Sequence, residues 1–122
     1  MEAQAQSALS VDKEISRGIV TIYKDYLGRG PTRSQTVISR DYVTTVCEDG
    51  LTRAERNLVD TGEADTVRQI RRKFQSAMRE EIMSLVGAAT GRPVRSLLSD
   101  HDVINDIAVE IVVLDPAAED AE

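Results

Sequence analysis

Residues 28–50, with the sequence GRGPTRSQTVISRDYVTTVCEDG, stop a helix and then start a β-hairpin. Gly28 suits the left-handed position that ends a helix, and Pro31 keeps the helix from resuming. Two runs of β-branched and aromatic residues follow, residues 37–39 and 42–47, with polar residues between them. This pattern predicts two antiparallel strands joined by a short turn.

An amphipathic helix is predicted immediately before this stretch. Apolar residues recur there at spacings of three and four, which places them on one face of a helix. They are Ile15, Ile19, Ile22, Tyr23, Tyr26 and Leu27. Ser10 is a candidate for the residue that caps the first turn.

A second helical region is predicted after the hairpin. Thr52 and Glu55 form the capping-box pattern that marks a helix start, so a short helix is expected over about residues 53–60. A threonine and a glycine interrupt it. Asp65 is then expected to cap a long helix over residues 66–89, which carries one apolar stripe.

Two more strands are predicted in the last third of the chain. Residues 94–98 are mostly apolar, and residues 107–114, IAVEIVVL, form the most strand-like run of all. Between them, residues 99–106, SDHDVIND, are predicted to form a solvated polar loop. Pro116 is expected to end the last strand.

The two halves of the chain share the order helix, strand, strand. Their helix-to-strand joins also match, with GRGPTRS at residues 28–34 and GRPVRS at residues 91–96. We therefore predict a pseudo-symmetric α+β fold of αββαββ order, with a four-stranded, mainly antiparallel sheet and a medium and a long helix on one face. This single domain would span residues 8–115, with flexible polar or acidic tails at residues 1–7 and 116–122. The other sheet face would be solvated or would pair with a second subunit.

The composition excludes several classes of protein. A length of 122 residues fits one domain, and a net charge of −6 disfavours a nucleic-acid-binding protein. The N-terminus lacks the pattern of a signal peptide, and no apolar run is long enough to span a membrane. With a single cysteine, the chain fits a reducing cytoplasmic location.

The two Gly-Arg-Pro turns are candidate sites for an anion or a partner. Their arginines are Arg29, Arg33, Arg92 and Arg95. Glycine-rich turns and arginines can hold phosphate, but each turn follows a helix C-terminus, where the helix dipole disfavours an anion. No Walker lysine is present. A structural turn is the favoured interpretation, and an anion or partner contact is the alternative.

The long helix carries a basic stripe that could contact phosphates or an acidic partner. Its members are Arg68, Arg71, Arg72 and Lys73. The alternative, which we favour, is a solvated face in which these side chains pair with acidic residues such as Glu63 and Asp65.

Asp100, His101 and Asp102 are candidate metal ligands, because carboxylates and an imidazole can bind a divalent cation. The glycine and terminal glutamate of an EF-hand loop are absent, which favours an ordinary loop. Cys47 is expected to be a half-buried structural thiol. An enzyme that uses His101 with Asp100 or Cys47 is a third hypothesis, but no catalytic motif is recognised and no cofactor is predicted.

The order of these features resembles a small bacterial family named for MpsC, a component of a sodium-translocating, membrane-potential-generating system. The resemblance is carried by YLGRGPTRSQTVI, LTRAERNLVDTGEADTVRQIRRKFQSAMREEIMSLV and TGRPVRSLLSDHDVINDIAVEIVVL. It covers nearly the whole chain and assigns no catalytic residues. It implies an accessory role in membrane ion or bicarbonate transport.

Two functions follow as expectations. The first is a non-catalytic cytoplasmic accessory protein that forms a homodimer through a sheet face, an edge strand or the long helix, and that docks on partner proteins. The alternative is a sensor of a small anionic ligand or nucleotide, in which the arginines of the two turns converge on one anion.

Overall fold

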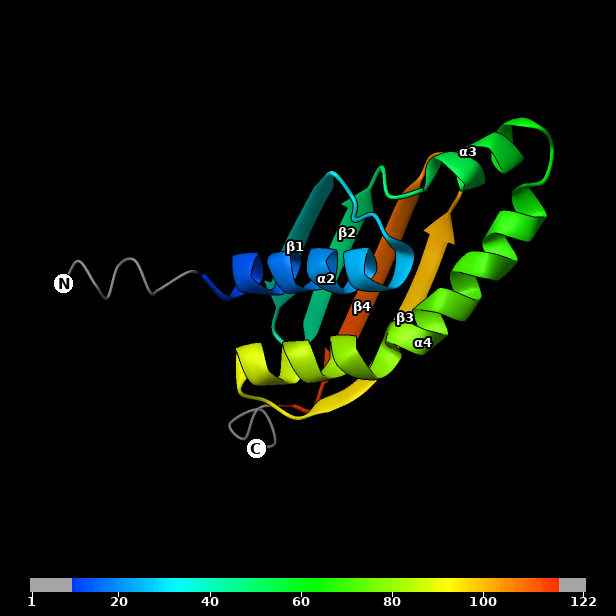
Figure 1. Cartoon of the computed structure of the whole chain (residues 1–122). Helices are drawn as coiled ribbons and strands as arrows, with labels where there is room; N and C mark the ends of the chain where they lie inside the picture. The colour runs from blue at the N-terminus through cyan, green and yellow to red at the C-terminus, as the bar shows by residue number, and fades with distance from the viewer. Residues whose placement is uncertain (1–9, 117–122) are drawn as a thin grey trace, which may run out of the picture.

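The computed structural model describes residues 10–116, in which the elements follow the order helix, two strands, two helices, two strands. Figure 1 shows the helices and the sheet that the strands form. The helices are α2 (Val11–Leu27), α3 (Arg53–Asp60) and α4 (Ala64–Thr90), and the strands are β1 (Arg33–Ser39), β2 (Tyr42–Glu48), β3 (Val94–Asp102) and β4 (Ile107–Leu114). The predicted α+β fold is confirmed. The predicted tails lie outside the described residues, apart from Pro116.

The helix boundaries follow the predicted signals in most places. Gly28 ends α2 with a φ of 79°, and its amide donates to the carbonyl of Lys24. The capping box of Thr52 and Glu55 is present at the start of α3. Asp65 was predicted to cap α4, and this is wrong, because Glu63 occupies the N-cap position and Asp65 lies in the first turn.

The strand β3 is longer than predicted, and this corrects the interpretation of residues 99–106. Residues 99–102 continue the strand and pair with β4, so only residues 103–106 form the turn. Residues 99–106 were predicted to be a loop because most of them are polar. Ser99 and His101 find polar partners inside the molecule, which removes the usual reason for polar residues to face water.

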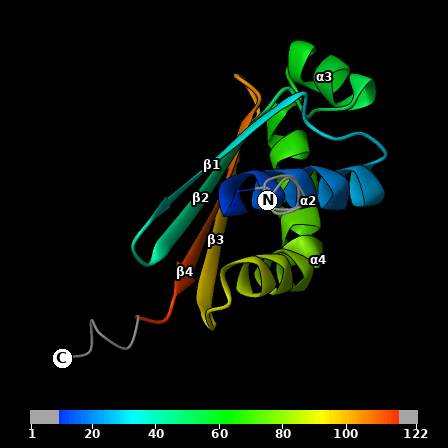
Figure 2. The same ribbon diagram turned by 90° about the vertical axis from the view of Figure 1, so that its left-hand side faces the viewer.

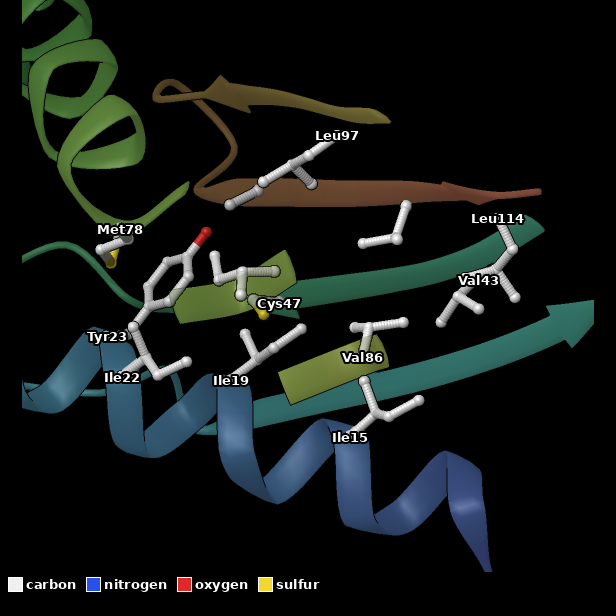
Figure 3. Packing of buried hydrophobic residues seen from close by; sticks show 13 residues of the cluster. Ile15, Ile19, Ile22, Tyr23, Val43, Cys47, Met78, Val86, Leu97 and Leu114 are labelled. Carbon is white, nitrogen blue, oxygen red and sulfur yellow. The ribbon is translucent and has the colours of Figure 1, made fainter. Parts of the chain in front are cut away.

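The described helices lie on the same side of the sheet, as Figure 2 shows, with α2 and α4 packed against it and α3 packed on α4. The sheet has the order β1-β2-β4-β3, and each neighbouring pair is antiparallel. Figure 1 shows that the second half of α4 runs beside α2 in the opposite direction. The core lies between these helices and the sheet, where Ile19, Cys47 and Val86 pack together (Figure 3).

The two halves are related by an approximate two-fold axis between β2 and β4. The amide of Asp49, just after β2, donates to the carbonyl of Asp106 in the turn of the other hairpin. The amide of Leu114, at the end of β4, donates in the same way to Asp41 in the first turn. These matching contacts support the internal repeat seen in the sequence. Among residues 10–52, the short helix α3 has no counterpart.

Candidate functional site

The two Gly-Arg-Pro turns lie at opposite ends of the sheet. The first turn leads into β1 at the end where β2 finishes and β4 starts. The second leads into β3 at the end where β4 finishes and β2 starts. The arginines of the two turns, Arg29 and Arg33 in the first and Arg92 and Arg95 in the second, therefore do not surround a shared anion.

Arg29 binds the backbone of its own half of the molecule. Its Nη1 atom donates to the carbonyls of Asp49, at 2.7 Å, and Leu51, at 2.8 Å. Its Nη2 atom lies 3.3 Å from the Asp49 carboxylate. Hydrogen bonds from Thr32 and Arg29 lower the pKa of Asp49. This guanidinium ties the end of α2 to the end of β2, as a structural joint requires.

Arg92 likewise binds the backbone just after the last strand of its own half, and it also reaches the turn of the first hairpin. Its Nη2 atom donates to the carbonyl of Asp115, just after β4, and to the carboxylate of Asp41, both at 2.6 Å. Its Nη1 atom donates to the carbonyl of Arg40 at 2.9 Å. Arg33 and Arg95, by contrast, are exposed at the starts of the two outer strands.

The basic stripe on α4 is not one continuous surface. Arg71 has a side chain that is only 1% exposed, and it donates from Nε and Nη2 to the two carboxylate oxygens of Glu55 at 2.9 and 2.6 Å. Burial opposes ionisation of Glu55, but the hydrogen bonds and the charge of Arg71, together with the hydrogen bonds of Thr52, outweigh it and lower the pKa of this carboxyl. Arg68 pairs with Asp65, as the solvated-face interpretation expects. Arg72 and Lys73 are exposed.

The candidate metal ligands do not point to a common centre. His101 is buried, and its Nε2 atom lies 3.0 Å from a carboxylate oxygen of Asp106. Asp102 instead accepts hydrogen bonds from the amides of Ile104 and Asn105, which holds the turn. Among residues 10–116, no group of three or more histidine, cysteine, aspartate or glutamate side chains is arranged to hold a metal ion.

Cys47 is more deeply buried than expected. Its side chain lies in the core between the sheet and the helices (Figure 3). Burial raises the pKa of the Cys47 thiol to about 12. The thiol is therefore protonated at neutral pH and does not have the properties of a nucleophile.

A row of polar side chains crosses the buried face of the sheet, one from each strand. Thr36 faces Thr45, Thr45 faces Glu110, and Glu110 faces Ser99. The hydroxyls of Thr36 and Thr45 are 2.7 Å apart, and Ser16 of α2 lies 2.7 Å from Thr36. Side-chain hydrogen bonds therefore join β1 to β2 and β3 to β4, in addition to the backbone pairing.

Glu110 is the one ionisable member of this row, and its side chain is 1% exposed. Its carboxylate accepts hydrogen bonds from the hydroxyls of Tyr23 and Ser99 and from the amide of Gln75. Burial raises the pKa of Glu110, and these donors partly offset the shift. Burial also raises the pKa of Tyr23. The sequence IAVEIVVL contains one indication that Glu110 is buried, because the glutamate stands in an otherwise apolar strand, at a position that faces the core.

An open groove of about 640 Å³ lies between α2 and the edge strand β1. It is lined by Asp12, Lys13, Ser16, Arg17, Val20 and Thr21 of α2 and by Ser34, Gln35 and Thr36 of β1. These residues were not predicted as a site, because none of them belongs to a recognised motif. Only the adjacency of α2 and β1 brings them together.

The outer face of the sheet carries many apolar side chains, and no described helix covers it (Figure 2). Its exposed apolar members are Val37, Tyr42, Leu98 and Ile107, and its half-buried ones are Val46, Val109, Ile111 and Val113. The alternation of each strand places these side chains opposite the core, together with polar residues such as Thr44, Glu48 and Asp100. Exposed apolar surface can mark a site of interaction.

No helix within the described part of the chain combines the length and the apolar character that a membrane crossing requires.

Comparison with known proteins identifies relatives without a defined activity. The family model described as "Na+-translocating membrane potential-generating system (MpsC)" matches residues 7–116. "Uncharacterized protein YbcI" of Bacillus subtilis (strain 168) is 32% identical over 92 residues, which cover 75% of this chain and 74% of that protein. No solved structure gives a significant match. With the match spanning nearly all of its length, the chain belongs to the MpsC family.

Proposed function

We propose that this protein is a non-catalytic cytoplasmic accessory protein that binds a component of a membrane ion-transport system through the outer face of its sheet. The single observation that carries the proposal is the apolar outer face. Leu98 and Tyr42 are 57% and 54% exposed there, while all the described helices pack on the opposite side. The family description supplies the link to a sodium-translocating, membrane-potential-generating system.

A binding role is supported by the burial of Cys47 and His101, two residues that were candidates for catalysis. The Cys47 thiol is buried and has a raised pKa. The His101 ring is buried and bonded to Asp106, and burial lowers the pKa of His101. Neither group is accessible beside an open cavity, as a general base or nucleophile would be.

The test is co-purification of the tagged protein with the membrane subunits of the sodium-translocating system of the same organism. Leu98→Lys places a charge on the outer face, and we expect it to abolish co-purification without changing the thermal midpoint of unfolding. Arg72→Glu, on the opposite side of the molecule, is the matched control and should retain the partner. Retention by Leu98→Lys together with loss by Arg72→Glu would place the contact on the helical side.

A second measurement links binding to transport. We expect cells that lack the gene to show a reduced sodium-dependent membrane potential, measured with a voltage-sensitive dye. The wild-type gene should restore the potential, and the gene carrying Leu98→Lys should not. Full restoration by this variant would contradict a role for the outer face.

A further inference from the structure

The two edges of the sheet differ in how well they are protected from pairing with another strand. The edge strand β3 contains an irregularity between Val94 and Ser96 and carries Arg95, Asp100 and Asp102. Charges and bulges of this kind prevent a further strand from adding to an edge. The edge strand β1 pairs regularly with β2 along all seven of its residues, and after Arg33 it carries no charge and no proline.

The second half of β1 exposes apolar side chains on both faces of the sheet. Val37, on the outer face, is 58% exposed. Ile38 shares the inner face with Thr36, because alternate residues of a strand point the same way. Thr36 is buried under Ser16, but Ile38 is 40% exposed. An isoleucine on the core side of the sheet therefore lacks the cover that its neighbour has.

The first half of β1 has the complementary shape. Ser34 and Thr36 form the floor of the open groove beneath α2, and Val20 contributes an apolar wall. One half of the strand thus presents a projecting side chain, and the other half presents a hollow on the same face. Two such strands fit together when they run in opposite directions, because each projection then meets the other strand's hollow.

We propose that a second copy of this chain pairs antiparallel with β1, with the two-fold axis passing through Thr36, to form one sheet of eight strands. In this register Ile38 of each copy lies opposite Ser34 of the other and enters its groove. Val37 lies opposite Gln35 on the outer face. Arg33 lies opposite Ser39, so the pairing brings no like charges together.

The charge distribution favours contact at this edge over contact elsewhere. Each chain carries a net charge of −6, so two copies repel each other on average. Residues 34–39 are uncharged, and the groove beside them is lined by both signs of charge, Asp12 with Lys13 and Arg17. Pairing at β1 also satisfies the backbone groups that an edge strand leaves open. A second copy can therefore form backbone hydrogen bonds with β1 without bringing like charges close together.

This inference does not rest on the accessory role, because it concerns the isolated chain. The first experiment measures the molar mass of the full chain by size-exclusion chromatography with light scattering at micromolar concentration. We expect twice the mass of one chain. A monomer under these conditions would overturn the proposal.

Two lysine substitutions of equal exposure locate the interface. Val37→Lys places a charge on the β1 edge, and we expect it to give a monomer with an unchanged circular dichroism spectrum. Leu98→Lys is the matched control, since Leu98 is exposed to nearly the same extent near the other edge. It should remain a dimer. A dimer that survives Val37→Lys, or that is lost in Leu98→Lys, would contradict pairing at β1.

Disulfide trapping tests the register without depending on destabilising variants. Under mild oxidation, a mixture of Ser34→Cys chains and Ile38→Cys chains should give a cross-linked dimer. Each variant alone should give little, because in the proposed register neither position faces itself. Cys47 does not compete, since it is buried. Cross-linking of the single variants that mixing does not increase would exclude a two-fold axis at Thr36.

Discussion

The two halves of this molecule are built on the same plan but differ in their chemistry. Each half consists of a helix, a Gly-Arg-Pro joint and a hairpin, and each joint arginine binds the backbone where its own hairpin ends. The first half has Thr45 at the centre of its inner strand, and the second has the ionisable Glu110 opposite it. The joints are therefore alike in the two halves, whereas the residues in the middle of the sheet and at its edges differ.

The Gly-Arg-Pro joint is therefore structural in both halves, although the surfaces around the two joints differ in their residues. Arg29 and Arg92 are occupied by carbonyl oxygens and nearby carboxylates, whereas Arg33 and Arg95 are exposed. The surfaces that we propose for partners are instead the edge strand β1 with its groove and the outer face of the sheet, which carry no recognised motif.

The largest expected effect concerns the ion pair of Arg71 with Glu55, which joins α4 to α3. We expect Arg71→Ala to lower the free energy of unfolding by about 3–5 kcal/mol, since it leaves the carboxylate of Glu55 without its partner. The measurement is urea denaturation at neutral pH. The neighbouring exposed Arg72→Ala should change the free energy by less than about 0.5 kcal/mol. Equal effects of the two variants would contradict the burial of Arg71.

The joint arginines test the symmetry directly. Arg29→Ala and Arg92→Ala should each lower the free energy of unfolding by about 1–3 kcal/mol, because each removes a charged donor from backbone carbonyls. The two losses should be similar, and Arg33→Ala, at an exposed position, should have little effect. A loss confined to one of the two joints, measured by the same denaturation experiment, would show that the halves are not equivalent.

The joint glycines should show a smaller and again matched effect. Gly28 and Gly91 have positive φ values of 79° and 69°, and a Cβ atom at either position would meet no other group within 4 Å. Replacement by alanine should therefore cost about 1 kcal/mol at each joint, from backbone conformation alone. Thermal unfolding would measure it. Gly28→Asn should cost less than Gly28→Ala, because asparagine tolerates this conformation, and the reverse order would point to a steric cause.

The smallest expected effect is a change in pH dependence caused by Glu110. Below its ordinary pKa of 4.5, the carboxyl is protonated in both the folded and the unfolded chain. As the pH rises above this value, the unfolded chain ionises first, so the contribution of Glu110 to stability falls until the pH passes the raised folded pKa. The hydrogen bonds donated by Ser99, Tyr23 and Gln75 limit the rise in the pKa of Glu110, and so they limit this loss of stability.

Glu110→Gln should remove this part of the pH dependence. The free energy of unfolding of the variant, measured by denaturation across the acidic to neutral range, should gain on that of the wild type as the pH rises. The two proteins should be closest in acid, where the wild-type carboxyl is protonated. Parallel profiles for the two proteins would mean that Glu110 ionises equally in both states.

Much of the fold could be predicted from the sequence, because local signals were strong. The capping box at Thr52, the glycine stop at Gly28 and the hairpin around residues 39–42 all appear in the structure. The extent of β3 could not be predicted, since Ser99 and His101 are polar residues of the kind that face water, and only the folded hairpin brings Glu110 to Ser99 and Asp106 to His101. Local pattern does not reveal a polar side chain whose hydrogen bond is supplied by tertiary structure.

The site residues were harder to predict than the fold. Arg71 has the sequence context of an exposed basic stripe, and only the placement of α3 beneath it shows that it is buried. The alternative in which the two turns converge on one anion does not fit the structure, because the antiparallel pairing of β2 with β4 places the turns at opposite ends of the sheet. The favoured interpretation, a structural turn, does not depend on this pairing. The groove beside β1 depends on the same three-dimensional arrangement.

The polar row across the buried face of the sheet also bears on how the chain folds. Each hairpin can form from neighbouring residues, but the pairing of β2 with β4 joins segments distant in sequence. Glu110 receives one donor, Ser99, from its own hairpin, whereas the Tyr23 hydroxyl comes from α2 in the first half. A chain whose halves have not docked leaves this carboxyl incompletely bonded, and a slip of one residue would turn it to the opposite face. We therefore expect the halves to fold as one cooperative unit, with intermediates that contain a single folded half scarcely populated.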